Sequence, residues 1–213
     1  MDNKSCVVFD LDDVLIDTES NLDWLFRALR KTLSEYGIKN SEENISKIHS
    51  KNLHGFYKAC RELNVEPEEF WQTRNNYYVK EKIKAIKNRE ISTFTDVDSI
   101  LDLKDRYKLA ILSDSPQEIV ELFVEEFGFE DLFECIIGRG SSLEDLKKLK
   151  PSYHPFNRLM KNMHCKKLFY VGHSKRDRQF AENNGLKFIL LDRRNNNRGF
   201  DSLNKVVDYL LTL

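Results

Sequence analysis

Residues 6–15 of the chain read CVVFDLDDVL, a short apolar run that ends abruptly in acidic side chains. Because residues 6–9 are apolar without alternation, they predict a strand buried on both faces, as in a parallel sheet. Asp10 and Asp12 follow at its carboxyl end, where open α/β sheets bind ligands. Residues two apart in an extended chain project to one side, so these carboxylates repel each other unless a cation or proton intervenes. A divalent cation with a phosphate is the simplest answer, and an ordinary strand before an acidic loop is the alternative.

Three further segments place polar side chains at comparable positions. Residues 109–116 read LAILSDSP and predict a second buried strand that ends in hydroxyl groups. Lys150, followed by proline, precedes a helix-like segment. Residues 168–174 read LFYVGHS, which predicts a strand ending in a turn, and Asp177 follows. Four candidate sites therefore lie along the chain in a fixed order.

The order and approximate spacing of these sites resemble those of the haloacid dehalogenase (HAD) superfamily, over nearly the whole chain. The chain is similar to its phosphoglycolate-phosphatase-like subgroup, in which a helical cap is inserted after the first strand. The motif Asp10-x-Asp12 after an apolar strand is fairly specific. The motifs at Ser113 and Lys150 are weak alone and gain weight only from this order.

Composition bounds the class of protein. The chain has 213 residues, enough for one domain with an insertion, and a formal net charge of -1. This balance argues against a nucleic-acid binder, which would carry a basic excess. No run approaches the roughly 20 apolar residues that a membrane span needs. We therefore expect neither nucleic acid nor a membrane as partner. The resemblance implies a small phosphorylated substrate, and we expect a monomer or homodimer.

The cysteines suggest a reducing compartment. The four of them, at positions 6, 60, 135 and 165, lack the spacing of metal sites. Cys6 and Cys135 lie in apolar runs and are predicted to be buried small hydrophobes. No apolar signal core precedes the first strand. These features predict a cytoplasmic location.

Hydrophobic periodicity divides the chain into two parts. Between residues 17 and 92 the period of 3.6 predicts helices only, at about 22–33, 41–49 and 55–63 and from Pro67 onward. From residue 93 onward, helices and strands alternate, with strands expected at 108–113, 135–138, 168–172 and 187–191. Such alternation indicates right-handed βαβ units. We predict an α/β fold: a doubly wound, mostly parallel, Rossmann-like core of residues 1–16 and 93–213, with an inserted α-helical cap of residues 17–92.

The resemblance implies a metal-dependent phosphohydrolase that forms an aspartyl-phosphate. Phosphoryl transfer depends mostly on positioning and charge neutralisation, and a carboxylate nucleophile divides the reaction into two easier steps. By resemblance, Asp10 is that nucleophile. By the same resemblance, Asp12 is the general acid and then the general base, and its backbone carbonyl also binds the metal. The presence of this second acid favours phosphoryl chemistry over dehalogenation. Ser113, Asp114 and Lys150 bind the substrate phosphate.

Two of these residues have structural alternatives. Ser113 could cap the helix expected from residue 116, although Ser115 is the better candidate for that cap. Lys150 lies in a lysine-rich stretch, residues 147–150, that would suit a solvated surface. The proline that follows singles out Lys150 within that stretch.

The fourth motif departs from the family's Gly-Asp-x-x-x-Asp pattern. Residues 172–177 read GHSKRD, so His173 replaces the acid that binds Mg²⁺, while Asp177 remains. Mg²⁺ prefers oxygen ligands, whereas imidazole suits Mn²⁺, Co²⁺, Ni²⁺ or Zn²⁺. Asp177 could take over Mg²⁺ directly or through water, the site could use a softer metal, or activity could be largely lost. Asp177 could also be a structural partner of a neighbouring basic residue. The expected ligands are Asp10, Asp12, Asp177 and His173, and the expected cofactor is Mg²⁺, with Mn²⁺ or Co²⁺ as alternatives.

A second class of function remains open. A HAD-like binding or regulatory module with weak or no turnover would account for His173. Asp10 and Asp12 argue against it, because a module without chemistry needs neither acid. In the enzyme, specificity would come from the cap, whose first turn at residues 17–21 follows the catalytic strand.

Overall fold

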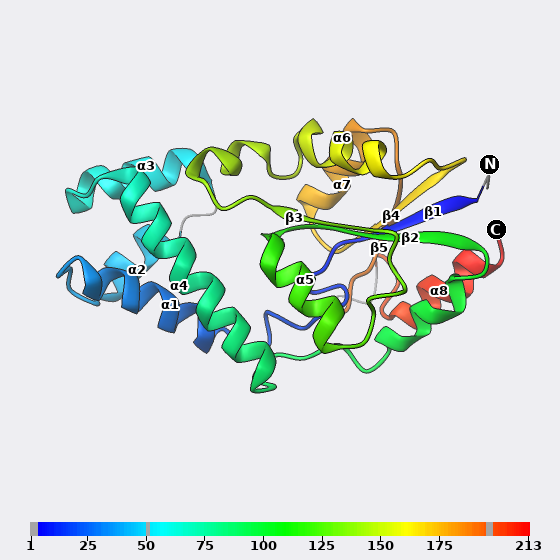
Figure 1. Cartoon of the computed structure of the whole chain (residues 1–213), viewed down its shortest axis with the longest axis horizontal. Coiled ribbons are helices and arrows are strands. Elements are labelled where there is room, and N and C mark those ends of the chain that lie inside the picture. Colours follow the sequence, from blue (N-terminus) through cyan, green and yellow to red (C-terminus); the bar gives the residue numbers. More distant parts are fainter. Residues whose placement is uncertain (1–3, 50–51, 195–197) are drawn as a thin grey trace.

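A parallel sheet forms the centre of the molecule (Figure 1). The computed structural model describes residues 4–49, 52–194 and 198–213. Its strand order is β3-β2-β1-β4-β5, and every neighbouring pair is parallel. The predicted strands are confirmed: β1 (Ser5–Phe9), β2 (Tyr107–Pro116), β3 (Cys135–Arg139), β4 (Leu168–Gly172) and β5 (Lys187–Leu190).

Helices cover both faces of this sheet (Figure 1). One face carries α5 (Gln117–Glu126) and α8 (Leu203–Leu211), and the other carries α6 (Tyr153–Asn162) and α7 (Lys175–Asn183). Side chains of β1 alternate between two buried clusters, one on each face. The prediction of a doubly wound α/β fold is confirmed. Two segments are 3₁₀ helices, η1 (Val97–Leu103) and η2 (Leu143–Lys148).

Four helices form a separate block at one end of the molecule (Figure 1). They are α1 (Asp23–Glu35), α2 (Glu42–Ile48), α3 (Leu53–Leu63) and α4 (Pro67–Lys87). Proline begins α4, as expected, and α1 buries one apolar face. The block leaves the core after Ile16 and rejoins it at Thr93, which pair through a β-bridge. Within the described residues, no helix is long and apolar enough to cross a membrane.

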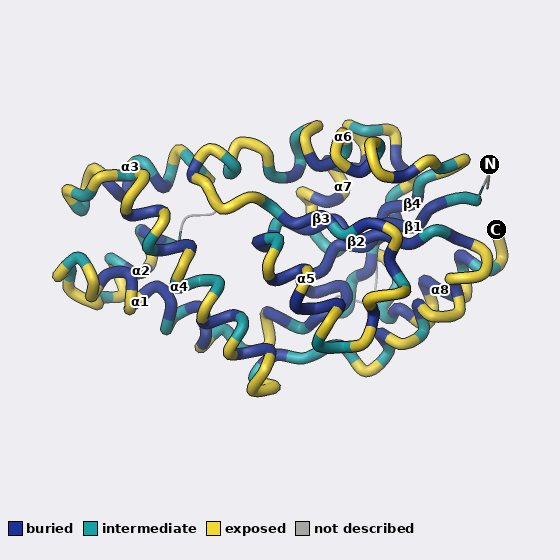
Figure 2. The backbone as a smooth tube through the Cα atoms, in the orientation of Figure 1, coloured by how far each residue is buried: buried dark blue, intermediate teal, exposed yellow. Residues whose placement is uncertain are grey.

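The hydrophobic core continues from the sheet into this helical block (Figure 2). Its aromatic residues pack mainly against one another: Phe56 lies edge-on to Trp71, and Tyr36 edge-on to Phe70. Phe56, Phe70 and Trp71 are all buried. These aromatic side chains form the packed interior of the helical block.

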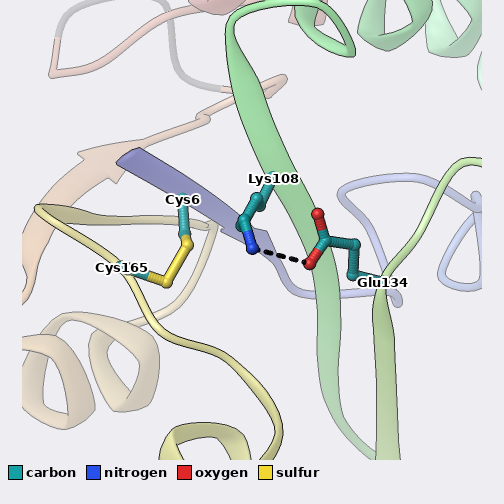
Figure 3. The surroundings of a disulfide bond; sticks show 4 residues. All are labelled: Cys6, Lys108, Glu134 and Cys165. Carbon is teal, nitrogen blue, oxygen red and sulfur yellow. Dashed lines mark ion pairs between the residues drawn. A yellow bond between two sulfur atoms is a disulfide. The ribbon is translucent and has the colours of Figure 1, made fainter. Parts of the chain in front are cut away.

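The structure corrects the expectation for one cysteine. Cys135 is buried and free, as predicted, but Cys6 is half of a disulfide with Cys165 (Figure 3). The backbone N–H of Cys6 donates to Lys167 O, which brings β1 beside the segment before β4. The two Cα atoms lie 5.6 Å apart although 159 positions separate the residues in sequence. No local pattern could have indicated this pair.

Candidate active site

The carboxyl ends of β1, β2 and β4 meet at one edge of the sheet. Because β1 lies between β2 and β4, the chain order reverses at this point, which is where open α/β sheets bind ligands. A cavity of ≈ 590 Å³ lies between this edge and the helical block. All seven residues that the sequence singled out line it: Asp10, Asp12, Ser113, Asp114, Lys150, His173 and Asp177.

Lys150 is the charged centre of the site. Its Nζ lies 3.0 Å from Asp10 Oδ2 and 2.6 Å from Asp177 Oδ1, and it donates to the Tyr170 hydroxyl at 2.9 Å. Burial would lower the pKa of Lys150, but Asp10 and Asp177 raise it well above its ordinary value. Burial also raises the pKa of Asp10 well above its ordinary value, against the opposing effect of Lys150. Lys150 therefore remains a cation next to the first aspartate, buried rather than on a solvated surface.

Asp177 is held tightly against the end of β4. A Cβ on Gly172 would lie 2.5 Å from Asp177 Cβ, so only glycine permits this approach. Asp177 Oδ2 accepts hydrogen bonds from the backbone N–H and hydroxyl of Ser174 and from the backbone N–H of His173. Burial would raise its pKa, but Lys150 and these donors hold it well below its ordinary value. Its salt bridge is to Lys150, and no described neighbour on α7 pairs with it.

Asp12 is bound by a residue that the sequence did not indicate. Lys82 on α4 approaches Asp12 Oδ1 to 2.5 Å, and the Ser115 hydroxyl donates to Asp12 Oδ2 at 2.6 Å. Lys82 also donates to Ser115 Oγ at 2.8 Å. Burial would raise the pKa of Asp12, but Lys82 and Ser115 hold it below its ordinary value. The carboxylate of Asp12 is therefore ionised and fully engaged.

The prediction that Ser115 caps α5 is wrong. The helix begins after Pro116, and no side chain caps it. Ser115 turns instead toward Lys82 and Asp12, because these charged partners form stronger hydrogen bonds than a helix terminus. Ser113 Oγ accepts a hydrogen bond from the backbone N–H of Ser115 at 3.0 Å and lines the cavity.

His173 lies between several carboxylates. Its Nδ1 is 3.8 Å from Asp10 Oδ2 and 3.6 Å from Asp177 Oδ2, and its Nε2 is 4.0 Å from Asp13 Oδ2. Nδ1 is buried and has no hydrogen-bond partner among the described residues. Asp13 adopts a left-handed backbone conformation, with φ 58°, which points to local constraint at the site.

The sequence matches one family over most of its length. A family model described as haloacid dehalogenase-like hydrolase covers residues 7–191. The chain belongs to this family. This membership confirms the resemblance seen in the motifs and the expectation of a HAD-type enzyme.

Solved structures of other HAD proteins share the fold. A predicted phosphoglycolate phosphatase from Haemophilus somnus 129PT has a TM-score of 0.69 at 21% identity, covering 99% of each chain. CbbY from Rhodobacter sphaeroides, in complex with phosphate, has a TM-score of 0.68 at 18% identity, covering 95% of this chain and 96% of the other. A HAD-superfamily hydrolase of subfamily IA from Geobacter sulfurreducens PCA has a TM-score of 0.61 at 14% identity, covering 98% and 99%. Comparison with curated proteins gives no match.

The charges at this HAD site fit a divalent cation. The carboxylates of Asp10, Asp12, Asp13 and Asp177 line the cavity. Among the described residues, three lysine or arginine side chains lie within 4.0 Å of these carboxylates: Lys82, Lys150 and Arg194. Burial raises the pKa of Asp13, and the neighbouring Asp12 raises it further, so an added positive charge would stabilise this carboxylate. An excess of negative charge is what a metal ion would neutralise.

The ligand atoms also converge, in two overlapping groups. One contains Asp10, His173 and Asp177, and the other contains Asp13, Glu19 and His173, each with ligand atoms within 4.8 Å of one another. His173 belongs to both groups, and its unpartnered Nδ1 is free to act as a ligand. Asp177 is less suited to direct ligation, because both of its oxygens already accept hydrogen bonds.

Asp114 supports Lys150 from the other side. Its Oδ1 accepts the backbone N–H of Lys150 at 3.0 Å, and its Oδ2 lies 3.3 Å from an Arg176 nitrogen. A carboxylate repels phosphate, so any contact of Asp114 with a substrate phosphate would have to come from its backbone N–H. The geometry assigns its side chain to holding the Lys150 segment in place.

Proposed function

We propose that the chain is a metal-dependent phosphohydrolase that acts on a small phosphorylated metabolite through an aspartyl-phosphate on Asp10. The observation that carries this proposal is the 3.0 Å contact between Asp10 and the buried Lys150 ammonium, at the sheet edge where Asp12 also lies. A carboxylate nucleophile beside a fixed cation suits phosphoryl transfer, because the transferring group brings negative charge toward the nucleophile.

In the first step, Asp10 attacks phosphorus while the ammonium of Lys150 faces the phosphate oxygens. The Ser113 hydroxyl and the backbone N–H groups at the start of α5 would bind the remaining oxygens. Asp12 then protonates the leaving oxygen and later removes a proton from the attacking water. Because Lys82 keeps Asp12 ionised, the negative phosphate must raise the pKa of Asp12, or Lys82 must withdraw, before the proton is available.

The metal would be held by Asp10, by the backbone carbonyl of Asp12 and by His173, with Asp177 acting through water. When bound, it would neutralise charge between Asp10 and the phosphate. Mg²⁺ is the proposed cofactor, and imidazole ligation favours Mn²⁺ or Co²⁺ as better activators. We assign residues 1–16 and 93–213 to the catalytic core and residues 17–92 to a cap that excludes water and selects the leaving group.

The second candidate function is a HAD-like binding module with little turnover. The observation that favours it is the Lys82–Asp12 ion pair, which keeps the expected general acid deprotonated. We retain the cytoplasm as the proposed location, although the Cys6–Cys165 disulfide is more typical of oxidising compartments.

A phosphatase screen tests the proposal. The purified protein is assayed for phosphate release from a panel of phosphorylated carboxylic acids, sugars and nucleosides, with Mg²⁺, Mn²⁺ or Co²⁺ and with a chelator. We expect metal-dependent release from at least one class and none from Asp10→Asn. Release that persists in the chelator or in Asp10→Asn would contradict the proposal, and no release from any substrate would favour the binding module.

A further inference from the structure

Six cationic side chains line the active-site cavity, and they divide into two kinds. Four have a carboxylate oxygen within 4.0 Å: Lys82, Lys150, Arg176 and Arg194. The other two, Arg74 and Arg139, have no such partner among the residues that the structure describes. Neither of these two guanidinium groups therefore forms an ion pair with a described residue.

Arg74 is the more deeply buried of the two. It lies on α4 and is only 8% exposed. Its Nε donates to Ile48 O at 3.0 Å, which fixes the guanidinium, while its terminal nitrogens form no hydrogen bond with any described residue. Burial, together with the nearby Arg139, lowers the pKa of Arg74 to about 10. A buried charge without a counterion is costly, which indicates that an anion completes the site.

Arg139 reaches the same place from the core. It ends β3, and its terminal nitrogens donate to Asn75 Oδ1 at 2.7 Å and Gly140 O at 2.8 Å. The guanidinium carbons of Arg74 and Arg139 lie 5.2 and 5.3 Å from the centre of the Trp71 ring. Trp71 is itself fixed, because its Nε1 donates to Ser141 O at 2.8 Å. Cap and core thus hold two guanidinium groups against one rigid indole.

The geometry points to a second anion-binding subsite at Arg74 and Arg139, for a carboxylate or second phosphate on the leaving-group side of the substrate. This inference rests on the proposed function and narrows its substrate class. Lys150 serves the reacting phosphate, so a second anion in the same cavity would face Arg74 and Arg139. The planar guanidinium matches the paired oxygens of carboxylate and phosphate. Phosphorylated carboxylic acids and bisphosphates would satisfy both sites, whereas a neutral leaving group would leave both arginines unpaired.

Matched ligand pairs test the subsite through binding. Calorimetric titration at constant ionic strength compares phosphoglycolate with 2-hydroxyethyl phosphate, and the bisphosphate of 1,3-propanediol with its monophosphate. The titrations use Asp10→Asn, so that ligand is not consumed. We expect the member with the additional anionic group, in at least one pair, to bind about 10- to 100-fold more tightly, the range for a charge-assisted hydrogen bond. The first pair reports a carboxylate and the second a phosphate.

Substitutions test whether the two arginines cause any preference for the ligand with a second anionic group. Arg74→Gln and Arg139→Gln, each added to Asp10→Asn, should remove the preference by weakening the binding of the member with the second anionic group much more than that of the member that lacks it. Arg74→Lys keeps the positive charge and should therefore retain part of the binding preference. The matched control is Arg30→Gln, which removes an exposed cap arginine outside the cavity. Equal affinity within both ligand pairs, or a preference that survives in both glutamine variants, overturns the subsite.

Turnover separates this inference from the proposed function. Wild type is assayed with p-nitrophenyl phosphate, whose leaving group does not carry a second anionic group for the arginines. Hydrolysis of this substrate without any binding preference would contradict the subsite but would still support the proposed phosphohydrolase. A binding preference without hydrolysis of any phosphate ester would support the subsite and contradict the proposed function.

Discussion

Lys82 of the cap lies 2.5 Å from Asp12 of the core, although 70 positions separate the two residues in sequence. The ammonium also contacts Ser115 Oγ and lies 5.4 Å from the centre of the Trp24 ring. Burial would lower the pKa of Lys82, but Asp12 raises it above its ordinary value. The cap is therefore joined to the expected acid/base group by a charged pair.

Removing this cation should destabilise the folded chain. Lys82→Met leaves Asp12 without its charged partner, so we expect a loss of about 1 to 3 kcal/mol in the free energy of unfolding. This is less than for a fully buried pair, because the Asp12 side chain is 26% exposed. Urea denaturation measures the loss, with Lys80→Met, an exposed lysine on the same helix, as the control. Equal stability of the two variants would show that the ion pair contributes nothing.

Asp177 should make the fold sensitive to acid. Its folded pKa lies below the ordinary value of about 3.9, so on acidification the unfolded chain binds a proton first. Its stabilising contribution is complete above about pH 5 and is lost as the pH falls through the folded pKa. Asp177→Asn should be less stable than wild type at pH 7 and should lose stability less steeply below pH 5.

Urea midpoints between pH 7 and pH 3 measure this effect at constant ionic strength. Asp208→Asn, on the exposed side of α8, is the control and should follow the wild-type profile. An acid limb as steep in Asp177→Asn as in wild type would contradict the assignment.

Prediction from sequence succeeded where the signal was local. The apolar run of β1 and the 3.6-residue period of α1 each indicate which side chains are buried. The carboxyl ends of parallel strands must also meet at one edge of the sheet. This is why the sequence alone is enough to group Asp10, Ser113 and His173 at one edge of the sheet.

The remainder of the site depends on contacts between distant segments. Nothing in the lysine-rich second half of α4 singles out Lys82, because its identity as a site residue comes only from packing beside Asp12. Arg74 and Arg139 likewise lie close together only because α4 of the cap packs near the end of β3 in the core. The position of Ser115 before the helix suggested a helix cap. In the folded chain its hydroxyl instead donates to Asp12, which is paired with Lys82 from a distant part of the sequence.

Asp12→Ala should separate substrates by their leaving groups. General acid catalysis is worth about 10² to 10⁴ in rate, and an aryl phosphate needs less of it because its leaving group is a weaker base. We expect Asp12→Ala to slow phosphorylation by an alkyl phosphate much more than by an aryl phosphate. Stopped-flow or rapid-quench measurement of the first turnover gives both rates, and an equal reduction would exclude the acid role.

His173→Asp should strengthen Mg²⁺ binding. The substitution adds a negative charge, and a hard oxygen ligand, where Nδ1 now lies without a partner. Calorimetry of the substrate-free protein should show lower Mg²⁺ affinity in wild type than in His173→Asp, and a higher ratio of Mn²⁺ to Mg²⁺ affinity. Identical Mg²⁺ affinity in both proteins would place His173 outside the metal site, and Asp177→Asn would then be titrated.

Trapping the phosphorylated enzyme tests the central claim most directly. Wild type is mixed with a ³²P-labelled substrate and metal, quenched in acid within the first turnover, and digested for mass spectrometry. We predict phosphate on the peptide that contains Asp10, labile to hydroxylamine, and no label in Asp10→Asn, in which an amide replaces the nucleophile. Phosphate release without a labelled intermediate, or near-wild-type turnover by Asp10→Asn, would contradict the account.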